Sequence, residues 1–193
     1  SITFVASANC GLYCGADIDF IDIDRNSWNL SIKSLRTKLE EAEKSNKLPK
    51  IVVVVHLCGL PCEMEDIYFL SKKYGFFVIE DASHAIGSKY KDNLIGNCEY
   101  SDITIFSFHP VKTITTGEGG MAVTNSEKLS ERMKLLRSHG ITKDPNLMTK
   151  KMDGPWYYQQ IDLGFNYRMT DIQAALGCSQ VQRLSYFVSK RNE

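Results

Sequence analysis

The run IVVVV at residues 51–55 constrains the fold more than any other feature of the chain. β-Branched residues favour strands, and an uninterrupted apolar run is typical of a parallel strand buried on both faces. The runs FFVIED at 76–81 and DITIFSF at 102–108 are predicted as further strands, and MAVTN at 121–125 as a fourth. Because strands that alternate with helices form right-handed crossovers, the sequence predicts an α/β fold with a mainly parallel sheet and helices on both faces.

Apolar spacing and capping residues predict the helices that join these strands. Ser31 and Thr170 are good N-caps, and Gly75 is a good helix terminator. The expected helices cover residues 4–14, about 31–44, 64–74, 126–138 and one long final segment from 171. The alternating run DIDFIDID at 17–24 predicts one more strand, and residues 142–163 are expected to be irregular.

Charge and hydropathy exclude some functions that depend on bulk properties. The 193 residues contain 23 Lys+Arg and 23 Asp+Glu, so the formal net charge is zero. This balance argues against nucleic-acid or membrane-surface binding driven by overall charge. No apolar run approaches the length of a membrane span, and the N-terminus does not resemble a signal peptide, so we expect a cytoplasmic protein. The chain length suits one large domain, and both ends look cut.

The six cysteines raise the question of a metal site. Cys10 and Cys14 are separated by three residues, and so are Cys58 and Cys62. Structural zinc sites usually use the tighter C-x-x-C spacing in loops. We therefore expect no metal, and interpret the cysteines as small buried thiols in a reducing compartment.

Polar residues follow the predicted strands at the edge where parallel sheets bind ligands. They are His56, Asp81, Ser107, His109 and Lys112. Asp81 could cap a helix or turn, or it could pair with a cationic ligand group. Lys112 could be an ordinary surface lysine, or an amine with a lowered pKa that forms a Schiff base. Ser107 could cap the strand end or bind a phosphate.

The sequence lacks two common nucleotide-binding signatures. It contains no G-x-x-x-x-G-K-[ST] and no G-x-G-x-x-G after a strand, so ATP and NAD sites are unsupported. Gly117, Gly119 and Gly120 are interpreted mainly as the turn into the next strand. An acid, a lysine and a hydroxyl at neighbouring strand ends suit pyridoxal 5′-phosphate, which needs a partner for its ring nitrogen, an amine for its aldehyde and donors for its phosphate.

Several longer blocks carry a resemblance to a known family. They are EDASHAIGSKY, FSFHPVKTITTGEGGMAVTN, RSHGI and LGFNYRMTDIQAALG. In this order they closely resemble the DegT/StrS-type sugar-nucleotide aminotransferases, which have the fold-type I architecture of pyridoxal-phosphate enzymes. The resemblance covers nearly the whole chain. It implies that residues 1–193 are a partial cofactor-binding large domain, without the family's N-terminal phosphate loop and C-terminal small domain.

The resemblance also implies roles for residues that bind the cofactor. Lys112 matches the lysine that forms the Schiff base, and Asp81 matches the partner of the pyridinium nitrogen. His84 matches the residue near the phenolic oxygen, and Ser107 matches a phosphate-binding serine. Phe4 matches the aromatic residue that stacks on the cofactor ring; the sequence alone favours a core residue at Phe4, and His84 could be a satisfied core histidine.

Other matches concern the substrate and a second subunit. Asn166 matches an asparagine that reaches the phosphate from the neighbouring subunit of a homodimer. Arg168 and His109 are expected to contact the substrates, although Asn166 and Arg168 could instead form only the entry to the helix capped by Thr170. Leu60 departs from the glutamine of many relatives.

The activity that the resemblance implies is a ping-pong transamination. L-Glutamate would donate the amine, and a UDP-linked 4-keto-6-deoxy sugar would accept it. A sugar 3-dehydratase of the same family is an alternative, but those relatives carry His at the position of Lys112. A non-catalytic regulator with the same fold and a nicotinamide enzyme are further alternatives. Intact Asp81, Ser107 and Lys112 argue against the first of these, and the missing glycine fingerprint against the second.

Overall fold

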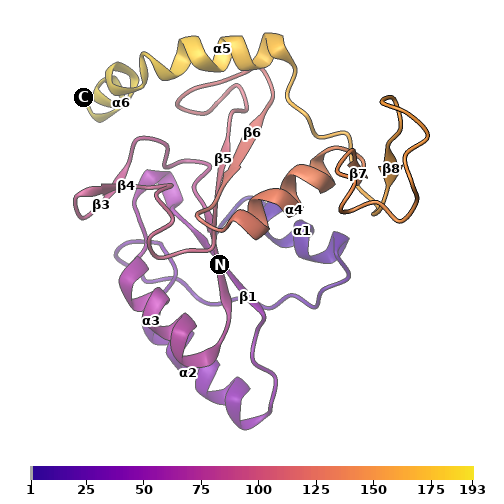
Figure 1. The fold of residues 1–193 in the computed structure, drawn as a ribbon. Coiled ribbons are helices and arrows are strands. Elements are labelled where there is room, and N and C mark those ends of the chain that lie inside the picture. The colour runs from indigo at the N-terminus through magenta and orange to yellow at the C-terminus, as the bar shows by residue number, and fades with distance from the viewer. Residues whose placement is uncertain (1) are drawn as a thin grey trace.

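The computed structural model describes residues 2–193, which surround a four-stranded central sheet (Figure 1). Its strands are β1 (Ile51–Val55), β2 (Phe77–Asp81), β5 (Ile103–Ser107) and β6 (Gly120–Val123), in the order β1-β2-β5-β6. The first three run parallel, and β6 runs antiparallel to β5. The predicted α/β fold with a mainly parallel sheet is therefore confirmed, and all four strands fall on the predicted apolar runs.

One face of the sheet is covered by α2 (Ile32–Lys44) and α3 (Met64–Tyr74). The predicted caps are present, because Ser31 Oγ accepts the Ser34 N–H and Gly75 ends α3 with a φ of 77°. Apolar side chains of both helices pack with alternate residues of β1 and β2. The buried helix and strand residues of this core are Leu35, Leu39, Met64, Ile67, Leu70, Tyr74, Val52, Val54 and Val78. This packing fixes the strand ends that carry the candidate site.

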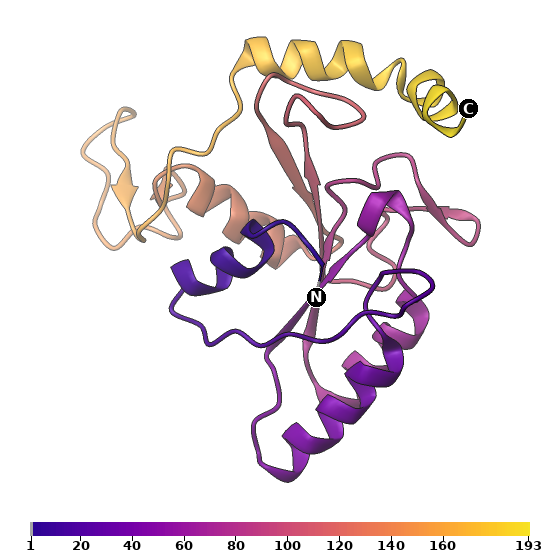
Figure 2. The ribbon, with the colours of Figure 1, turned by 180° about the vertical axis from the view of Figure 1, so that it is seen from behind.

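The helices α1 (Ala6–Tyr13) and α4 (Glu127–Arg137) lie on the opposite side of the sheet, as Figures 1 and 2 show, and neither contains a buried residue. The predicted helices on both faces are therefore present. Their cover is thinner here, because Phe77 on this face retains 61% of its exposure. The face of the sheet that bears Asp81 is consequently the more open one.

Shorter elements complete the chain. They are the 3₁₀ turn η1 (Leu57–Gly59), the hairpin of β3 (Lys89–Tyr90) with β4 (Asn93–Leu94), the pair β7 (Ile141–Thr142) and β8 (Gln159–Gln160), and the helices α5 (Asp171–Val181) and α6 (Leu184–Asn192). The segment with β7 and β8 extends away from the sheet beyond α4 (Figures 1 and 2). Thr170 forms a capping box with Gln173, as its sequence position suggests, but the single long helix predicted from 171 is divided into α5 and α6.

The strand predicted over residues 17–24 is wrong. Only Ile23 pairs across this region, in an isolated bridge with Leu30. Its aspartates accept backbone N–H groups from the residues that follow them: Asp19 from Phe20, Asp22 from Ile23, and Asp24 from Asn26 and Ser27. Such local hydrogen bonds compete with a strand ladder and favour turns.

The cysteines are all unpaired, and the interpretation of them as buried thiols is correct only for Cys62 and Cys98. Burial raises the pKa of Cys62 to about 12, so this thiol stays protonated at neutral pH. The other four, Cys10, Cys14, Cys58 and Cys178, are exposed. Within residues 2–193, no group of three or more His, Cys, Asp or Glu side chains is arranged to hold a metal ion.

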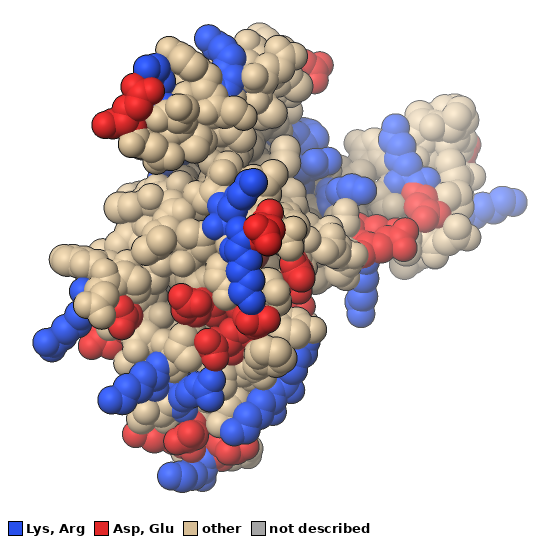
Figure 3. Space-filling model, turned by 90° about the vertical axis from the view of Figure 1, so that its left-hand side faces the viewer, with Lys and Arg blue, Asp and Glu red and all other residues tan. Residues whose placement is uncertain are grey.

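The surface carries charges of both signs. Figure 3 shows Lys and Arg interspersed with Asp and Glu over the face that it presents. This mixture agrees with the zero net charge of the sequence. Among the described residues, none of the helices has both the length and the apolar character needed to cross a bilayer.

Candidate functional site

The strand register places two candidate side chains on one face of the sheet. Asp81 pairs with Val55 of β1 and with Ile105 of β5. Side chains of paired residues in parallel strands point to the same face, and side chains two residues apart also share a face. Asp81 and Ser107 therefore project from the same, more open face at the carboxyl ends of neighbouring strands. This is the edge at which the sequence predicts a ligand site.

Both carboxylate oxygens of Asp81 accept hydrogen bonds. Oδ1 accepts the N–H of Ser83 at 3.1 Å and its hydroxyl at 2.6 Å. Oδ2 accepts the hydroxyl of Ser7, from α1, at 2.7 Å. The bond to the Ser83 N–H is a local turn interaction, which confirms the simpler of the two sequence interpretations, that of a turn carboxylate. The Ser7 bond is long-range, and neither serine was among the predicted site residues.

Lys112 lies in the loop that connects β5 to β6. Phe108 closes the base of this loop, since its N–H donates to Gly119 O at 2.8 Å and its carbonyl accepts the Thr116 N–H at 3.0 Å. Lys112 N–H donates to His109 O at 3.0 Å, and Arg191 of α6 donates to Lys112 O at 3.2 Å. The Lys112 side chain is half-buried. The loop therefore holds the lysine backbone in place beside the end of β5.

The glycines of this loop form its return into β6. Gly117 has a φ of 79°, which favours glycine, and Gly120 pairs with Ser107. A Cβ at Gly119 would lie 2.2 Å from Thr116 Oγ1. These glycines therefore form a tight turn, as predicted.

His84 follows Asp81 by three residues, and the charges of Asp81 and Lys112 both act on its ring. Burial lowers the pKa of His84, the positive charge of Lys112 lowers it further, and the negative charge of Asp81 raises it. The combined effect keeps the pKa below its ordinary value of 6.5, so the ring is neutral at pH 7. Three residues that the sequence assigned to one site thus interact electrostatically in the structure.

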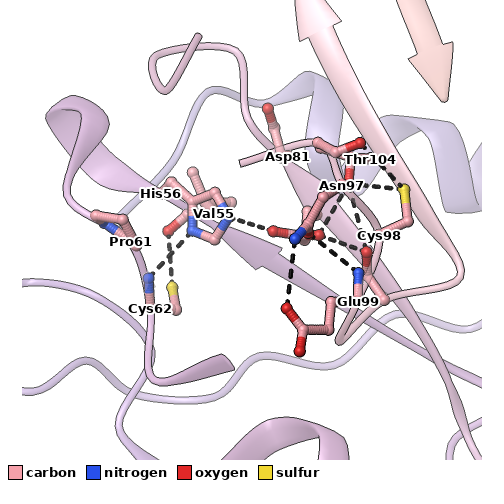
Figure 4. A network of polar contacts seen from close by, with 12 residues as sticks. Val55, His56, Pro61, Cys62, Asp81, Asn97, Cys98, Glu99 and Thr104 are labelled. Carbon is pink, nitrogen blue, oxygen red and sulfur yellow. Dashed lines mark hydrogen bonds and ion pairs between the residues drawn. The ribbon is translucent and has the colours of Figure 1, made fainter. Parts of the chain in front are cut away.

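A buried polar network lies on the opposite face of the same strand ends (Figure 4). Glu80 accepts hydrogen bonds from Thr104 Oγ1 at 2.8 Å and from the Ser101 hydroxyl, and His56 Nε2 lies 2.8 Å from its other oxygen. His56 Nδ1 accepts the Cys62 N–H at 3.1 Å, so Nε2 is the nitrogen that donates to Glu80. His56 is fully buried here, and it therefore supports the strand ends rather than meeting a ligand.

Glu80 remains ionised in this network. Burial raises its pKa, but the hydrogen bonds from His56 and Ser101, the charge attraction of His56 and the smaller effect of Thr104 outweigh burial and hold the pKa below its ordinary 4.5. A buried carboxylate is costly unless its oxygens are satisfied, and here both are. Asp81, the next residue, projects away from this network (Figure 4).

Phe4 and His109 are both accessible near the same edge. Phe4 lies two residues before the start of α1 and three before Ser7, and it retains 76% of its exposure, so the alternative of a core residue is wrong. His109 is exposed, and its Nε2 lies 3.8 Å from Glu118 Oε1. The backbone N–H of His109 donates to Ser107 Oγ at 3.4 Å, so Ser107 caps the end of β5, one of its two predicted roles.

Asn166 and Arg168 lie on a different segment. Asn166 forms a backbone bridge with Ser138, and its neighbours Phe165 and Tyr167 stack with ring centroids 4.7 Å apart. Both Asn166 and Arg168 are exposed. Within the described part of the chain, neither side chain hydrogen-bonds to Asp81, Ser107 or Lys112. Met169, the next residue after Arg168, packs against the cluster that contains Phe108 and Ile114, so this segment runs beside the loop that follows Lys112.

The residues at this edge suit the cofactor predicted from the sequence. An amine, a carboxylate with both oxygens oriented, and a strand-end hydroxyl are the groups that an aldehyde, a ring nitrogen and a phosphate require. Ser7 and Ser83 are the additional residues that sequence reasoning missed. Ser83 could have been found from its position two residues after Asp81, but no sequence signal joins Ser7 to a residue 74 positions away.

Comparisons with known proteins agree with this assignment. The model of the DegT/DnrJ/EryC1/StrS aminotransferase family matches residues 1–193. A UDP-4-amino-4,6-dideoxy-N-acetyl-beta-L-altrosamine transaminase of Campylobacter jejuni is 43% identical over 192 residues, which are 100% of this chain and 47% of that protein. The chain therefore spans about half the length of the curated relatives it matches.

Solved structures are similar over the same extent. Helicobacter pylori PseC, an aminotransferase involved in the biosynthesis of pseudoaminic acid, has a TM-score of 0.83 and 35% identity, and the match covers 96% of this chain and 45% of that one. A sugar aminotransferase of Streptococcus pneumoniae in its PLP form has a TM-score of 0.76 and 26% identity, with 95% and 47% covered. The predicted family resemblance is thus confirmed.

Proposed function

The chain belongs to the DegT/DnrJ/EryC1/StrS aminotransferase family, and we propose from this that it is the cofactor-binding part of a pyridoxal-phosphate-dependent sugar-nucleotide aminotransferase. The observation that carries the proposal is the convergence of Asp81, His84 and Lys112 at one edge of the sheet. The relative from C. jejuni, at 43% identity, and PseC favour a UDP-linked 4-keto-6-deoxy sugar as the acceptor and a role in pseudaminic acid biosynthesis. L-Glutamate is the proposed amino donor.

Each residue at the edge has a proposed role in holding the cofactor. Lys112 Nζ would bind its aldehyde carbon, Asp81 would pair with the protonated ring nitrogen, and Ser107 would donate to its phosphate. His84 would lie near its phenolic oxygen, and Phe4 would cover one face of its ring. Pyridoxal phosphate, when bound, supplies an electron sink that makes the α-carbon of an amino acid acidic.

The protein itself supplies proton transfer and orientation. Lys112 Nζ, once free, takes the proton from the α-carbon of the donor and later returns one to the sugar carbon that receives the amine. Asp81 maintains the positive charge of the ring nitrogen, because its carboxylate is held at both oxygens. His109 and Arg168 would bind the substrates, for which their exposure leaves them available.

We also propose a cytoplasmic homodimer in which Asn166 reaches the partner's site. Asn166 lies on a segment whose aromatic side chains are unusually accessible: Trp156 retains 71% of its exposure and Tyr167 72%. Aromatic residues of this kind are enriched in interfaces, and a second copy would cover them.

The test is product analysis with the full-length protein. Incubation with L-glutamate, pyridoxal phosphate and a UDP-linked 4-keto-6-deoxy sugar should replace the ketone oxygen by an amino group, as read by mass spectrometry. Lys112→Ala should lose turnover by at least about a thousandfold, whereas the exposed Lys128→Ala should retain it. Normal turnover in Lys112→Ala, or no conversion of any keto sugar, would show that the proposal is wrong. Conversion of GDP-linked sugars alone would show that the proposed UDP-linked acceptor is wrong.

A further inference from the structure

The hydroxyl of Ser7 connects α1 to the carboxylate of Asp81. Ser7 Oγ donates to Asp81 Oδ2 at 2.7 Å. Thr3 Oγ1 lies 3.1 Å from Ser7 Oγ. A serine hydroxyl carries one proton, and Asp81 receives it, so Thr3 must be the donor in the second contact. The two hydroxyls therefore form a relay, Thr3 to Ser7 to Asp81, that ends on the carboxylate oxygen not held by Ser83.

The two oxygens of Asp81 are held by different parts of the chain. Ser83 holds Oδ1 from within the turn that follows β2, and Ser7 holds Oδ2 from a residue 74 positions earlier. Because Oδ1 accepts two hydrogen bonds from Ser83 and Oδ2 accepts one from Ser7, rotation of the carboxylate about its terminal torsion breaks at least one of them. Hydrogen bonds to a charged acceptor are stronger than those between neutral groups, so this orientation is well defined.

The same turn of chain also carries Phe4. Ser7 N–H donates to Phe4 O at 3.2 Å, so the two residues belong to one hydrogen-bonded turn at the start of α1. The Phe4 ring is exposed, while Ser7 is half-buried against Asp81. Fixing Ser7 against the carboxylate consequently fixes the backbone from which the Phe4 ring projects.

We propose that Ser7 is a positioning residue that orients the Asp81 carboxylate for the ring nitrogen of the cofactor and sets the position of the Phe4 ring relative to that carboxylate. This inference rests on the proposed function. Ser7 itself contacts neither the cofactor nor the substrates; it acts through Asp81 and through the turn that it shares with Phe4.

The first experiment measures cofactor affinity in the full-length protein. Ser7→Ala should weaken pyridoxal phosphate binding about tenfold, the effect of one hydrogen bond to a charged group, and Ser7→Thr should restore it to within about twofold. Ser34→Ala, a matched change in α2 on the far face, should bind normally. If Ser7→Ala does not fold, Ser7→Cys keeps the side-chain shape with a weaker donor. Its affinity for pyridoxal phosphate should lie between that of wild type and the about tenfold weaker value expected without the hydrogen bond.

The second measurement separates orientation from general stability. Cofactor labelled with ¹⁵N at the ring nitrogen should show a resonance in Ser7→Ala that moves toward the unprotonated value, while Ser34→Ala leaves it unchanged. Phe4→Leu and Ser7→Ala should also be coupled, so that the double variant binds less weakly than the product of the two single fold-changes predicts.

The outcomes distinguish this inference from the proposed function. If Lys112→Ala abolishes turnover while Ser7→Ala changes neither affinity nor the ring-nitrogen resonance, the role of Ser7 is rejected and the enzyme assignment stands. The role of Ser7 would also be rejected if Ser7→Thr did not restore the cofactor affinity lost in Ser7→Ala. It would likewise be rejected if the double variant showed the full product of the fold-changes of Phe4→Leu and Ser7→Ala. Normal turnover in Lys112→Ala would instead remove the proposed function on which the inference rests.

Discussion

Replacing Glu80 by leucine should destabilise the fold by about 3 kcal/mol, because Glu80 is the shared acceptor of the buried network behind the site. Only 4% of this residue is exposed, and its carboxylate accepts from His56, Ser101 and Thr104. A leucine of similar volume removes the acceptor without leaving a large cavity. The expected loss is therefore due mainly to unsatisfied donors.

The three donors differ in what they lose. His56 Nε2–H is fully buried, and among the described residues Glu80 is its only acceptor. Glu80→Leu therefore leaves this donor without an acceptor, at a cost of about 1–3 kcal/mol. The hydroxyls of Ser101 and Thr104 lie 3.3 Å apart, and Thr104 is also 3.3 Å from Cys98 Sγ, so both retain weaker partners. Their lost bonds add about 1 kcal/mol each, and removal of the desolvated carboxylate offsets part of the sum.

Urea unfolding at pH 7, followed by circular dichroism, measures this loss. Glu131→Leu, at an exposed position of α4, is the matched control and should change the free energy of unfolding by no more than about 0.5 kcal/mol. A loss below about 1 kcal/mol in Glu80→Leu would refute the argument, because it would mean that the buried donors find other partners.

The same prediction has a pH dependence with a definite sign. The pKa of Glu80 in the folded protein lies below its ordinary 4.5, so the unfolded chain binds the proton more tightly. The stabilisation is therefore fully present above about pH 4.5 and is lost as the pH falls through the folded pKa. The difference in free energy of unfolding between wild type and Glu80→Leu should therefore become smaller as the pH falls. The other carboxylates are present in both proteins, so their contributions cancel in this difference. A gap that stays constant from neutral to acid pH would contradict the ionised state of Glu80.

Two further predictions concern the site edge and its neighbouring segment. In the cofactor-free protein, Lys112→Met should raise the pKa of His84 and Asp81→Asn should lower it, as followed by NMR titration; shifts of the opposite sign would refute the proximity of these charges. Gly140→Ala should destabilise the fold by at least about 2 kcal/mol in urea unfolding, because its φ is 67° and its Cβ would lie 2.0 Å from a backbone oxygen. Gly75→Ala, with φ 77° and open space around it, is the control for backbone strain alone and should cost less.

Much of the fold could be predicted because its signals are local. The run at 51–55 identifies a buried strand by its β-branched residues, and Ser31, Gly75 and Thr170 mark helix ends through hydrogen bonds within four residues. The site edge followed from a general rule about parallel strands rather than from contacts. Each of these inferences needs only residues near one another in the sequence.

The features that the sequence did not predict depend on competing local hydrogen bonds or on contacts between residues far apart in the sequence. Residues 17–24 alternate like a strand, but Asp19, Asp22 and Asp24 satisfy nearby N–H groups, and periodicity does not report that competition. The contact between Ser7 and Asp81 spans 74 residues, so no local pattern could reveal it. The break between α5 and α6, near Gln182, carries neither Gly nor Pro, and the sequence gives no other signal for it.

The alternation of β2 explains how a structural network and a candidate site occupy consecutive residues. Glu80 projects into the buried face and Asp81 into the open one, because successive side chains of a strand point to opposite faces. A shift of the Asp81 backbone would therefore move Glu80 and break its bonds to His56 and Thr104. The network fixes the position of the strand end, while Ser7 and Ser83 fix the torsion of the carboxylate on it. Changes at Glu80 should consequently appear first in stability, and changes at Ser7 first in cofactor binding.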